Sequence, residues 1–351
     1  MFLRDIWYFA MPGEALKSGG LANKVLLGEP LVFGRTRQGE PFALRDICPH
    51  RGVPLSAGHL YDAGSSGCGE AAIECPYHGW KFNTSGVCTE IPSLVPGQDI
   101  DVSRIRVRRY PVREVNGNIW VYMTDEKRAD LAPTHEPPAI PGFDGKSANI
   151  RESMTFSCHV DHAVIGLMDP AHGPFVHRSW YWRTKASIHE KAKNFAPSEM
   201  GFAMVEHTPS SNSFAYRILG GKPTTEISFR LPGIRLERIH AGRHRVVGLT
   251  AVTPIDETST EITQSFYWTL PLLSVAKPVL RRFMRAFLGQ DRDMVNLQQQ
   301  GLRFEPRLML INDSDVQAKW YHRLKNEWDE ATAQGRPFQN PVKPVTLRWR
   351  S

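Results

Sequence analysis

The chain has 351 residues, of which 41% are hydrophobic and 23% charged, so it can bury the cores of two domains and is not disordered. No stretch reaches the 18 apolar residues of a membrane-spanning helix, and residues 1–7 lack the pattern of a signal peptide, so we expect a soluble protein. The net charge of +7 comes from scattered basic residues, which favours docking of an acidic redox protein and argues against a nucleic-acid partner.

Residues 1–124 are predicted to fold into an all-β domain. Short apolar segments alternate there with turns that contain Gly or Asn, which is typical of antiparallel strands. Two motifs that contain cysteine and histidine fall between these segments, and we expect each at the tip of a hairpin. The segments are residues 24–27, 31–33, 42–47, 80–82, 87–91, 107–112 and 119–122.

The two motifs are CPHRG at residues 48–52 and CPYHGW at residues 75–80. Each supplies one thiolate and one imidazole; the four residues are Cys48, His50, Cys75 and His78. A zinc finger instead takes two cysteines from one loop and two histidines from another. The mixed pairing favours a Rieske [2Fe–2S] centre, in which two thiolates hold one iron and two imidazoles hold the other. Zinc is the alternative metal.

Three cysteines remain, namely Cys68, Cys88 and Cys158. An odd number argues against a secreted disulfide framework and for a reducing cytoplasm. Cys68 lies in the Gly- and Ser-rich segment 61–69, which predicts a surface loop, and no His follows it at the motif spacing. We therefore interpret Cys68 as a loop thiol rather than a ligand.

The second half of the chain predicts an α+β domain. A Pro- and Gly-rich linker at 125–147 separates domains 1–124 and 148–351. We expect helix and turn at 153–177, strands across 200–270, a long helix near 278–304, a last helix near 314–334, and a Pro-containing tail. The fold class is therefore α+β overall.

A second candidate metal site contains His172 and His177. On a straight helix, side chains five residues apart point about 140° away from each other. Gly173 and Pro174 lie between the two histidines and can bend the backbone so that their imidazoles converge. Two histidines with one carboxylate make the facial triad of non-haem Fe(II) oxygenases.

The carboxylate is sought on the long helix after Pro278. Asp291 falls within roughly 20° of Leu280 and Met284, on the apolar face of that helix, at about 100° per residue. A carboxylate there is costly unless it is paired or bound to metal. Asp293 points about 200° away, toward solvent, so Asp291 is the predicted ligand and Asp293 the alternative.

These motifs resemble the Rieske non-haem iron oxygenases, specifically their ring-hydroxylating and demethylating α subunits. The resemblance covers residues 5 to 300. The family pattern Asp-x-x-His-x4-His, followed by an acidic residue in a Glu/Gln-Asp context, matches Asp169, His172, His177 and Asp291. It implies a Rieske domain, a helix-grip (START-like) catalytic domain and a head-to-tail homotrimer. In that trimer Asp169 links a Rieske histidine of one subunit to an iron-ligand histidine of the next.

The chain departs from the family pattern in two places. His50 and Cys75 are separated by 24 residues, which is more than the family usually has, and the extra length falls in the segment 61–69. Many relatives have Asn where this chain has Ile165, which puts a polar fifth contact to iron in doubt.

The resemblance implies an oxidoreductase that uses O2 and electrons from NAD(P)H. The electrons arrive through a reductase, with or without a ferredoxin, and the products are those of mono- or dioxygenation or oxidative dealkylation of a small aromatic or cyclic substrate. Two other classes stay open: a Rieske electron-transfer protein, and a carrier of a hydrophobic ligand with structural metals. About three irons per chain are expected for the first class, about two for the second, and zinc or no metal for the third.

Overall fold

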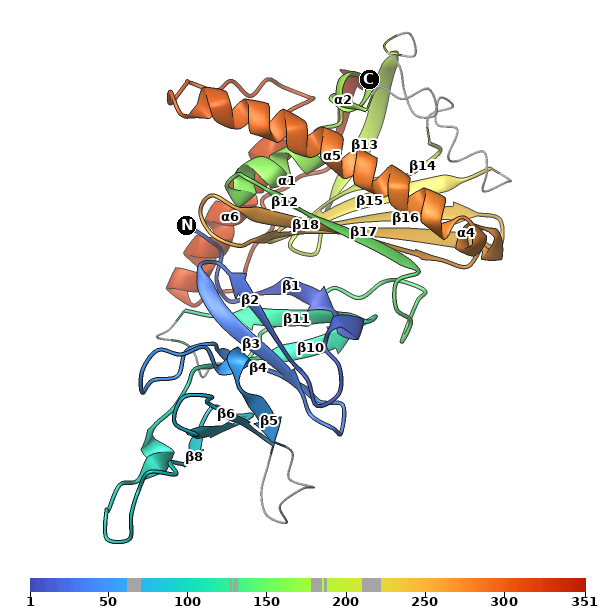
Figure 1. Cartoon of the computed structure of the whole chain (residues 1–351). Coiled ribbons are helices and arrows are strands. Elements are labelled where there is room, and N and C mark those ends of the chain that lie inside the picture. The colour runs from blue at the N-terminus through green and yellow to red at the C-terminus, as the bar shows by residue number, and fades with distance from the viewer. Residues whose placement is uncertain (62–70, 126–127, 129–131, 178–184, 186–187, 210–221) are drawn as a thin grey trace. The chain divides into compact units, whose positions relative to one another are not determined.

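A computed structural model describes residues 1–61, 71–125, 128, 132–177, 185, 188–209 and 222–351 (Figure 1). Chain contacts divide it into two compact units, Arg4–Ala139 and Ile140–Ser351, and the second unit also includes Met1–Leu3. Cys68 lies outside the described residues. Within them, no helix has the length and apolar character needed to cross a membrane.

The first unit is built from three antiparallel sheets, ordered β1-β11-β10, β2-β3-β4-β9 and β5-β6-β7-β8. Strands of two to seven residues alternate with tight turns, as the Gly and Asn spacing predicts. The strands are β1 (Ile6–Pro12), β2 (Leu21–Leu26), β3 (Glu29–Arg35), β4 (Pro41–Arg45), β5 (His59–Tyr61), β6 (Ala72–Glu74), β7 (Lys81–Asn83), β8 (Cys88–Glu90), β9 (Arg109–Tyr110), β10 (Val112–Val115) and β11 (Asn118–Met123), and the 3-10 helices are η1 (Gly13–Ala15), η2 (Leu55–Ala57) and η4 (Val102–Arg104).

Of the two Cys/His motifs, one lies at the tip of a hairpin as predicted and the other does not. Residues 75–80 lie at the tip of the β6–β7 hairpin, as expected. Residues 48–53 do not lie on a hairpin, because they connect β4 to η2, and β4 and β5 belong to different sheets. The two neighbours of β4 are already β3 and β9, so the chain that leaves it must continue into another sheet.

The second unit contains an eight-stranded antiparallel sheet, ordered β12-β18-β17-β16-β15-β14-β13-β19. The predicted helix and turn at 153–177 is wrong at its start, because residues up to 156 pair with β18. The predicted Pro-containing tail is present, but the prediction missed that it ends in a strand paired with β13. The strands are β12 (Ile150–Phe156), β13 (Glu190–Ser198), β14 (Gly201–His207), β15 (Thr224–Arg230), β16 (Ile234–Ala241), β17 (His244–Pro254), β18 (Thr260–Trp268) and β19 (Val345–Arg350).

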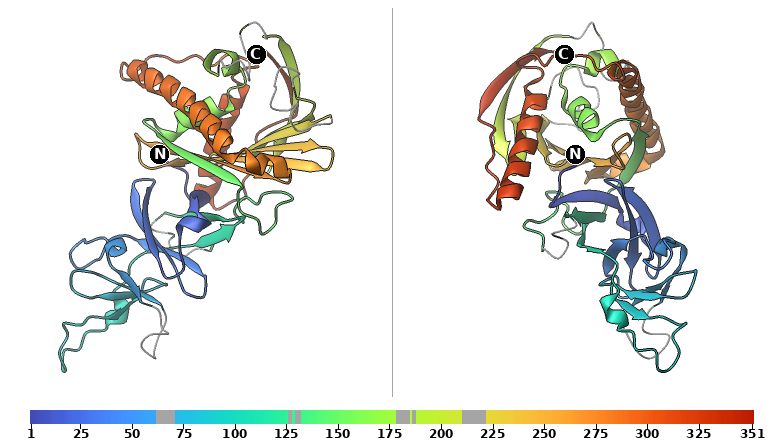
Figure 2. Two further views of the ribbon diagram at one scale, coloured as in Figure 1. Left: turned by 45° about the vertical axis from the view of Figure 1, so that its right-hand side comes forward. Right: turned by 90° about the vertical axis from the view of Figure 1, so that its left-hand side faces the viewer.

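The helices of this unit cover one face of its sheet (Figures 1 and 2). Met284 of α5 packs against Ile150 at the β12 end, and Trp320 of α6 packs against Phe195 on β13. Directly paired residues of antiparallel strands share a face, and the pairs that run from Ile150 to Phe195 put both on the same face. The helices are α1 (Val160–Met168), α2 (Gly173–Val176), α4 (Pro271–Val275), α5 (Lys277–Leu302) and α6 (Val316–Gln334).

Two ion pairs fasten α5 to the edge of the sheet. Glu152 on β12 is 8% exposed, and its two carboxylate oxygens lie 2.9 Å from Arg281 Nε and 3.1 Å from Arg285 Nη2. The helix continues without a break through Gly289. The long helix predicted near 278–304 is confirmed, and its position on β12 fixes where its later residues project.

A second polar cluster joins α1 to α6. The carboxylate of Asp161 accepts hydrogen bonds from Tyr321 Oη at 2.6 Å and from Lys325 Nζ at 2.5 Å. Burial raises the pKa of Asp161, but Lys325 and Tyr321 outweigh it and hold the pKa below the ordinary value of 3.8. Asp161 therefore stabilises the fold when it is ionised, and it anchors the helix that leads to residues 169–177.

We predict that Asp161→Asn lowers the free energy of unfolding by about 1–3 kcal/mol at pH 7, because it leaves Lys325 with no ionised partner in this cluster. The contribution of Asp161 is present above its unfolded pKa and is lost as the pH falls through its folded pKa, so the difference from wild type should shrink below about pH 4. Urea midpoints measured from pH 7 to pH 3 test this. Asp144→Asn, at an exposed position, is the control and should change neither midpoint nor pH dependence. A difference that persisted unchanged at pH 3 would contradict the assignment.

Candidate metal centres

Two loops of the first unit share one backbone design. In each, the Cys N–H donates to the carbonyl five residues later, and a Gly N–H four residues later donates back to the Cys carbonyl. Each Gly has a φ near +70°, in the left-handed region that favours Gly, so the type of residue fixes the turn. The bonds are Cys48 to Val53 (2.9 Å), Gly52 to Cys48 (2.9 Å), Cys75 to Trp80 (2.8 Å) and Gly79 to Cys75 (3.0 Å).

The side chains of these loops supply a pair of neighbouring thiols and a pair of neighbouring imidazoles. Cys48 and Cys75 are 1% and 2% exposed. The His50 ring lies 4.5 Å from the His78 ring and stacks on Trp80 at 4.6 Å, measured between centroids. His50 Nδ1 is buried, and no residue in the described part of the chain forms a hydrogen bond with it. An orphaned nitrogen of this kind fits a metal ligand.

The pKa shifts of the thiols and of the imidazole act differently on metal binding. Burial raises the pKa of Cys48 to about 11, and the nearby Cys75 adds to the effect, so a thiolate here requires a cation beside it. Burial and the neighbouring His78 lower the pKa of His50, which favours the neutral imidazole that binds metals. Two buried thiols beside two paired imidazoles fit a Rieske [2Fe–2S] cluster.

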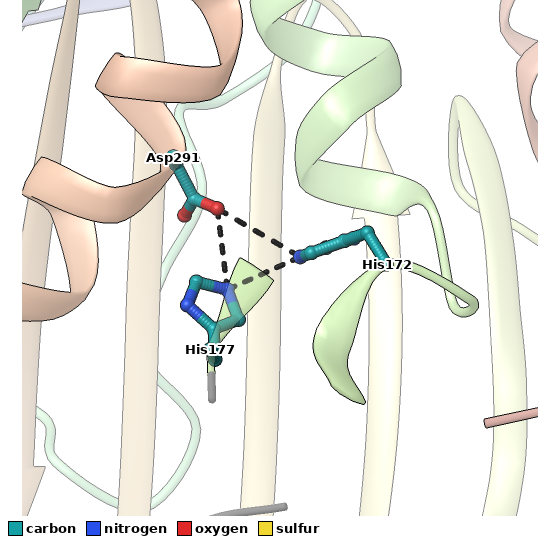
Figure 3. A group of neighbouring side chains, drawn as sticks. All are labelled: His172, His177 and Asp291. Atoms are coloured by element: carbon teal, nitrogen blue, oxygen red, sulfur yellow. Dashed lines mark hydrogen bonds and ion pairs between the residues drawn. The ribbon is translucent and has the colours of Figure 1, made fainter. Parts of the chain in front are cut away.

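The second group brings together His172, His177 and Asp291 (Figure 3). The Nε2 atoms of the two histidines lie 3.1 Å apart. Asp291 Oδ1 lies 3.2 Å from His177 Nε2 and 3.8 Å from His172 Nε2. All three donor atoms point at one another, as the chemistry of a shared cation requires.

The local sequence explains how two histidines five residues apart can converge. Helix α2 is only four residues long, with Gly173 and Pro174 in its first turn. His172 precedes the helix and His177 follows it, so the periodicity of a long helix does not set the directions of the two rings. Asp291 arrives from α5, while Asp293 is 61% exposed and pairs with Arg292 at 2.8 Å. The structure brings Asp291 to the histidines and leaves Asp293 facing solvent.

Asp169 lies beside this group, without a short contact to it. Its Oδ2 is 3.6 Å from His172 Nδ1, and its Oδ1 accepts a hydrogen bond of 2.7 Å from the Ala171 N–H. Burial lowers the pKa of His172, but the carboxylates of Asp169 and Asp291 outweigh that effect and raise it above the ordinary value. In the absence of metal, negative charge therefore accumulates around His172, and a cation would relieve it. Two neutral imidazoles with one carboxylate fit a non-haem Fe(II) ion.

Two residues that contact His177 were not predicted. Gln290 Oε1 lies 2.9 Å from His177 Nδ1, and the Phe287 ring stacks on the His177 ring at 3.6 Å and 12°. The helical period puts Phe287 on the apolar face of the long helix, and Gln290 directly precedes Asp291. Their spacing to Asp291, four residues and one, is the signal that could have found them, because residues at i, i+3 and i+4 share a helix face.

The sequence offers six aromatic residues that could line a substrate pocket, and the described ones differ in position; the six are Phe175, Trp180, Tyr181, Trp182, Phe202 and Phe266. Residues 180–182 lie outside the described residues. Phe202 is 2% exposed and packs against Trp320, so it belongs to the core between the sheet and α6. Phe266 packs with the α5 side of the sheet, and Phe175 is 49% exposed.

Comparisons with known proteins agree with this division of the chain. Residues 6–111 match the Rieske [2Fe-2S] domain family, and residues 156–331 match the vanillate O-demethylase oxygenase C-terminal domain family. Chlorophyllide a oxygenase of Chlamydomonas reinhardtii is 35% identical over 183 residues, covering 52% of this chain and 25% of the relative. The oxygenase component of dicamba O-demethylase of Stenotrophomonas maltophilia is 34% identical over 182 residues, 51% of this chain and 48% of the relative. The matches thus span between a quarter and a half of these relatives.

A solved structure extends the similarity in fold. The crystal structure of dicamba monooxygenase bound to dicamba aligns with a TM-score of 0.69 over 95% of this chain and 99% of that one, at 22% identity. Identity this low shows the fold alone. The predicted α+β architecture, a β-rich domain followed by a long antiparallel sheet with helices, is confirmed.

We predict that Asp291→Asn weakens Fe(II) binding at the three-residue group by at least about tenfold, because it replaces the anionic donor with a neutral amide. Competition of the protein with a chelator, followed by iron analysis, measures the change. Asp293→Asn is the matched control, two residues along the same helix, and should bind iron as the wild type does. Equal losses in both variants would point to general damage to α5 instead.

Proposed function

This chain belongs to the Rieske non-haem iron oxygenases, and on that premise we propose that it is the oxygenase component of a multicomponent enzyme. Such a component uses O2, with electrons from NAD(P)H delivered by a reductase or a ferredoxin, to hydroxylate or oxidatively dealkylate a small organic substrate. The convergence of His172, His177 and Asp291 is the observation that carries the proposal. An electron carrier would have no use for such a group, and a structural metal in a ligand carrier usually has a fourth protein ligand.

The cofactors of the chain are a Rieske [2Fe–2S] cluster and a mononuclear non-haem iron. We assign the cluster to Cys48, His50, Cys75 and His78, and the iron to His172, His177 and Asp291. When bound, the cluster supplies single electrons and the iron activates O2 beside the substrate. The buried thiols, the orphaned nitrogen of His50 and the convergent Nε2 atoms support these assignments.

The protein residues have distinct tasks in this chemistry. His172, His177 and Asp291 would hold the iron, and three protein ligands would leave it free to bind O2 as well. The fold keeps them in place through α2, which is too short to hold the histidines apart, and through α5, which is fastened by Glu152. Asp169 lies within 3.6 Å of His172 Nδ1 and is placed to orient that ring through its second nitrogen.

We propose an aromatic or cyclic substrate. Relatives act on chlorophyllide a and on dicamba, and the latter is demethylated at oxygen. Phe266 and Ile239 lie on the helix side of the sheet and offer apolar surface there. A flat apolar substrate suits such a surface because aromatic rings pack well against it.

A head-to-tail homotrimer completes the proposal. The Asp169 side chain is 34% exposed, so one of its oxygens can reach a histidine on another subunit while the other stays near His172. The segment after α5 supports an interface, because five large apolar side chains are exposed within eight residues there: Phe304 (79%), Leu308 (57%), Met309 (82%), Leu310 (40%) and Ile311 (57%). In this arrangement the cluster of one subunit serves the iron of the next.

Domain limits and localisation are also proposed. We place the Rieske domain at 1–124, the linker at 125–147 and the catalytic domain at 148–351; the contact boundary at Ala139 and Ile140 falls within that linker. We propose a cytoplasmic enzyme. This localisation is supported by the cysteines in the described part of the chain, which form no disulfide there and therefore suit a reducing compartment.

The function is tested by O2 uptake and product mass with a substrate panel, NAD(P)H and a surrogate reductase. Substrate-dependent O2 uptake is expected, with about three irons per chain. Asp169→Asn should keep all three irons but lower turnover by about 10- to 100-fold, because the amide orients His172 less well. No substrate-dependent uptake, or about two irons in the wild type, would sink the proposed function. Full turnover in Asp169→Asn would remove that residue from its proposed role.

Assembly is tested at the exposed segment. Met309→Glu places a charge in the proposed interface and should dissociate the trimer, so that the mass from sedimentation falls from three chains to one. Val275→Glu changes a side chain of equal exposure at the other end of α5 and should leave the trimer intact. A trimer that persists in Met309→Glu would show that the segment lies outside the interface.

A further inference from the structure

The two histidines of the three-residue group are held by different partners. His172 Nδ1 faces a carboxylate, Asp169, at 3.6 Å. His177 Nδ1 lies 2.9 Å from an amide oxygen, that of Gln290. The first distance exceeds a hydrogen bond and the second is a hydrogen bond of ordinary length. His177 is also the more buried ring, with 3% of its side chain exposed against 25% for His172.

We propose that Gln290 is a positioning residue that fixes the tautomer of His177, and this rests on the proposed function of the group as an iron site. An amide oxygen only accepts hydrogen bonds, so the proton of the neutral His177 ring must lie on Nδ1. The lone pair is then on Nε2, which is the atom that lies 3.1 Å from His172 Nε2 and 3.2 Å from Asp291 Oδ1. The opposite tautomer would point a hydrogen into the group and block ligation.

One helix face supplies the whole support for this ring. Phe287, Gln290 and Asp291 are spaced at i, i+3 and i+4 on α5 and lie on one side of it. Phe287 stacks on the ring face, Gln290 binds Nδ1, and Asp291 meets Nε2. Residues of a single turn therefore fix the plane of the His177 ring, the position of its proton and the direction of Nε2. Because Asp291 lies in the same turn, it keeps its place relative to the ring if the helix moves.

Gln290 carries no charge, which distinguishes it from the partner of His172. A carboxylate partner pulls the imidazole proton and makes the ring a stronger electron donor, whereas an amide orients the ring with less effect on its basicity. The two imidazoles should thus differ as ligands. Replacement of Gln290 by Glu keeps an acceptor oxygen, while replacement by Met keeps length and removes the acceptor.

The test is Fe(II) binding to protein that keeps its cluster but has been depleted of mononuclear iron. Gln290→Met should weaken Fe(II) binding by about 10- to 100-fold, and Gln290→Glu should retain affinity within about threefold of wild type or exceed it. Gln298→Met, an exposed position on the same helix, is the matched control and should change nothing. With Co(II) in place of Fe(II), the visible absorption should shift in Gln290→Met and not in Gln298→Met. Cluster absorption and circular dichroism report folding.

A second measurement needs no variant. Histidine 15N shifts of the wild-type protein without mononuclear metal should show His177 with its proton on Nδ1, and a proton on Nε2 would overturn the proposal even if Gln290→Met did not fold. Wild-type affinity in Gln290→Met, or equal losses in the Met and Glu variants, would also overturn it. If the wild type itself held no Fe(II) at this group, the proposed function would fail, and not merely the role of Gln290.

Discussion

The position of α5 on the edge strand β12 is the constraint on which the iron site depends. Two of the three proposed ligands come from one short stretch around α2, but the third must be delivered across the sheet by a helix of 26 residues. The buried carboxylate of Glu152 accepts ion pairs from Arg281 and Arg285, and Met284 packs beside them against Ile150. Burying Glu152 is favourable only because both arginines neutralise it, so the pairing also specifies where the helix lies. Asp291 follows Arg285 by six residues, which is about 1.7 turns of the helix.

The two loops of the first unit take their shape from local sequence and backbone hydrogen bonds. Each closes with a Gly at positive φ, and each presents its cysteine from a backbone that is bonded at both the N–H and the carbonyl. The loops differ in the offset of the histidine, two residues after Cys48 and three after Cys75. One backbone design thus delivers two imidazoles whose rings face each other at 4.5 Å. Rigid loops of this kind favour a prosthetic group because little conformational entropy is left to lose on binding.

The sequence predicted what short-range rules determine. The strands of the first unit, the long helix, the convergence of His172 and His177 about Gly173, and the choice of Asp291 over Asp293 all follow from turn chemistry and helical periodicity. The first loop was wrongly given to a hairpin, and β12 and β19 were missed, because pairing partners more than 60 residues away decide them. Helical spacing could mark Gln290 as a candidate, but its partner His177 is decided only when α5 and α2 are brought together.

The charge of the iron site links these observations. A divalent ion bound by two neutral imidazoles and Asp291 keeps a net positive charge, and a centre of this kind, only partly open to water, is stable only if nearby groups offset that charge. Asp169 lies on the His172 side and supplies a negative charge there. A third carboxylate, at position 290, would make the site overly negative when empty and would favour the more oxidised metal when filled. A neutral amide orients His177 without that cost. The identity of residue 290 therefore reflects the charge that the site can bear as well as the geometry of the ring.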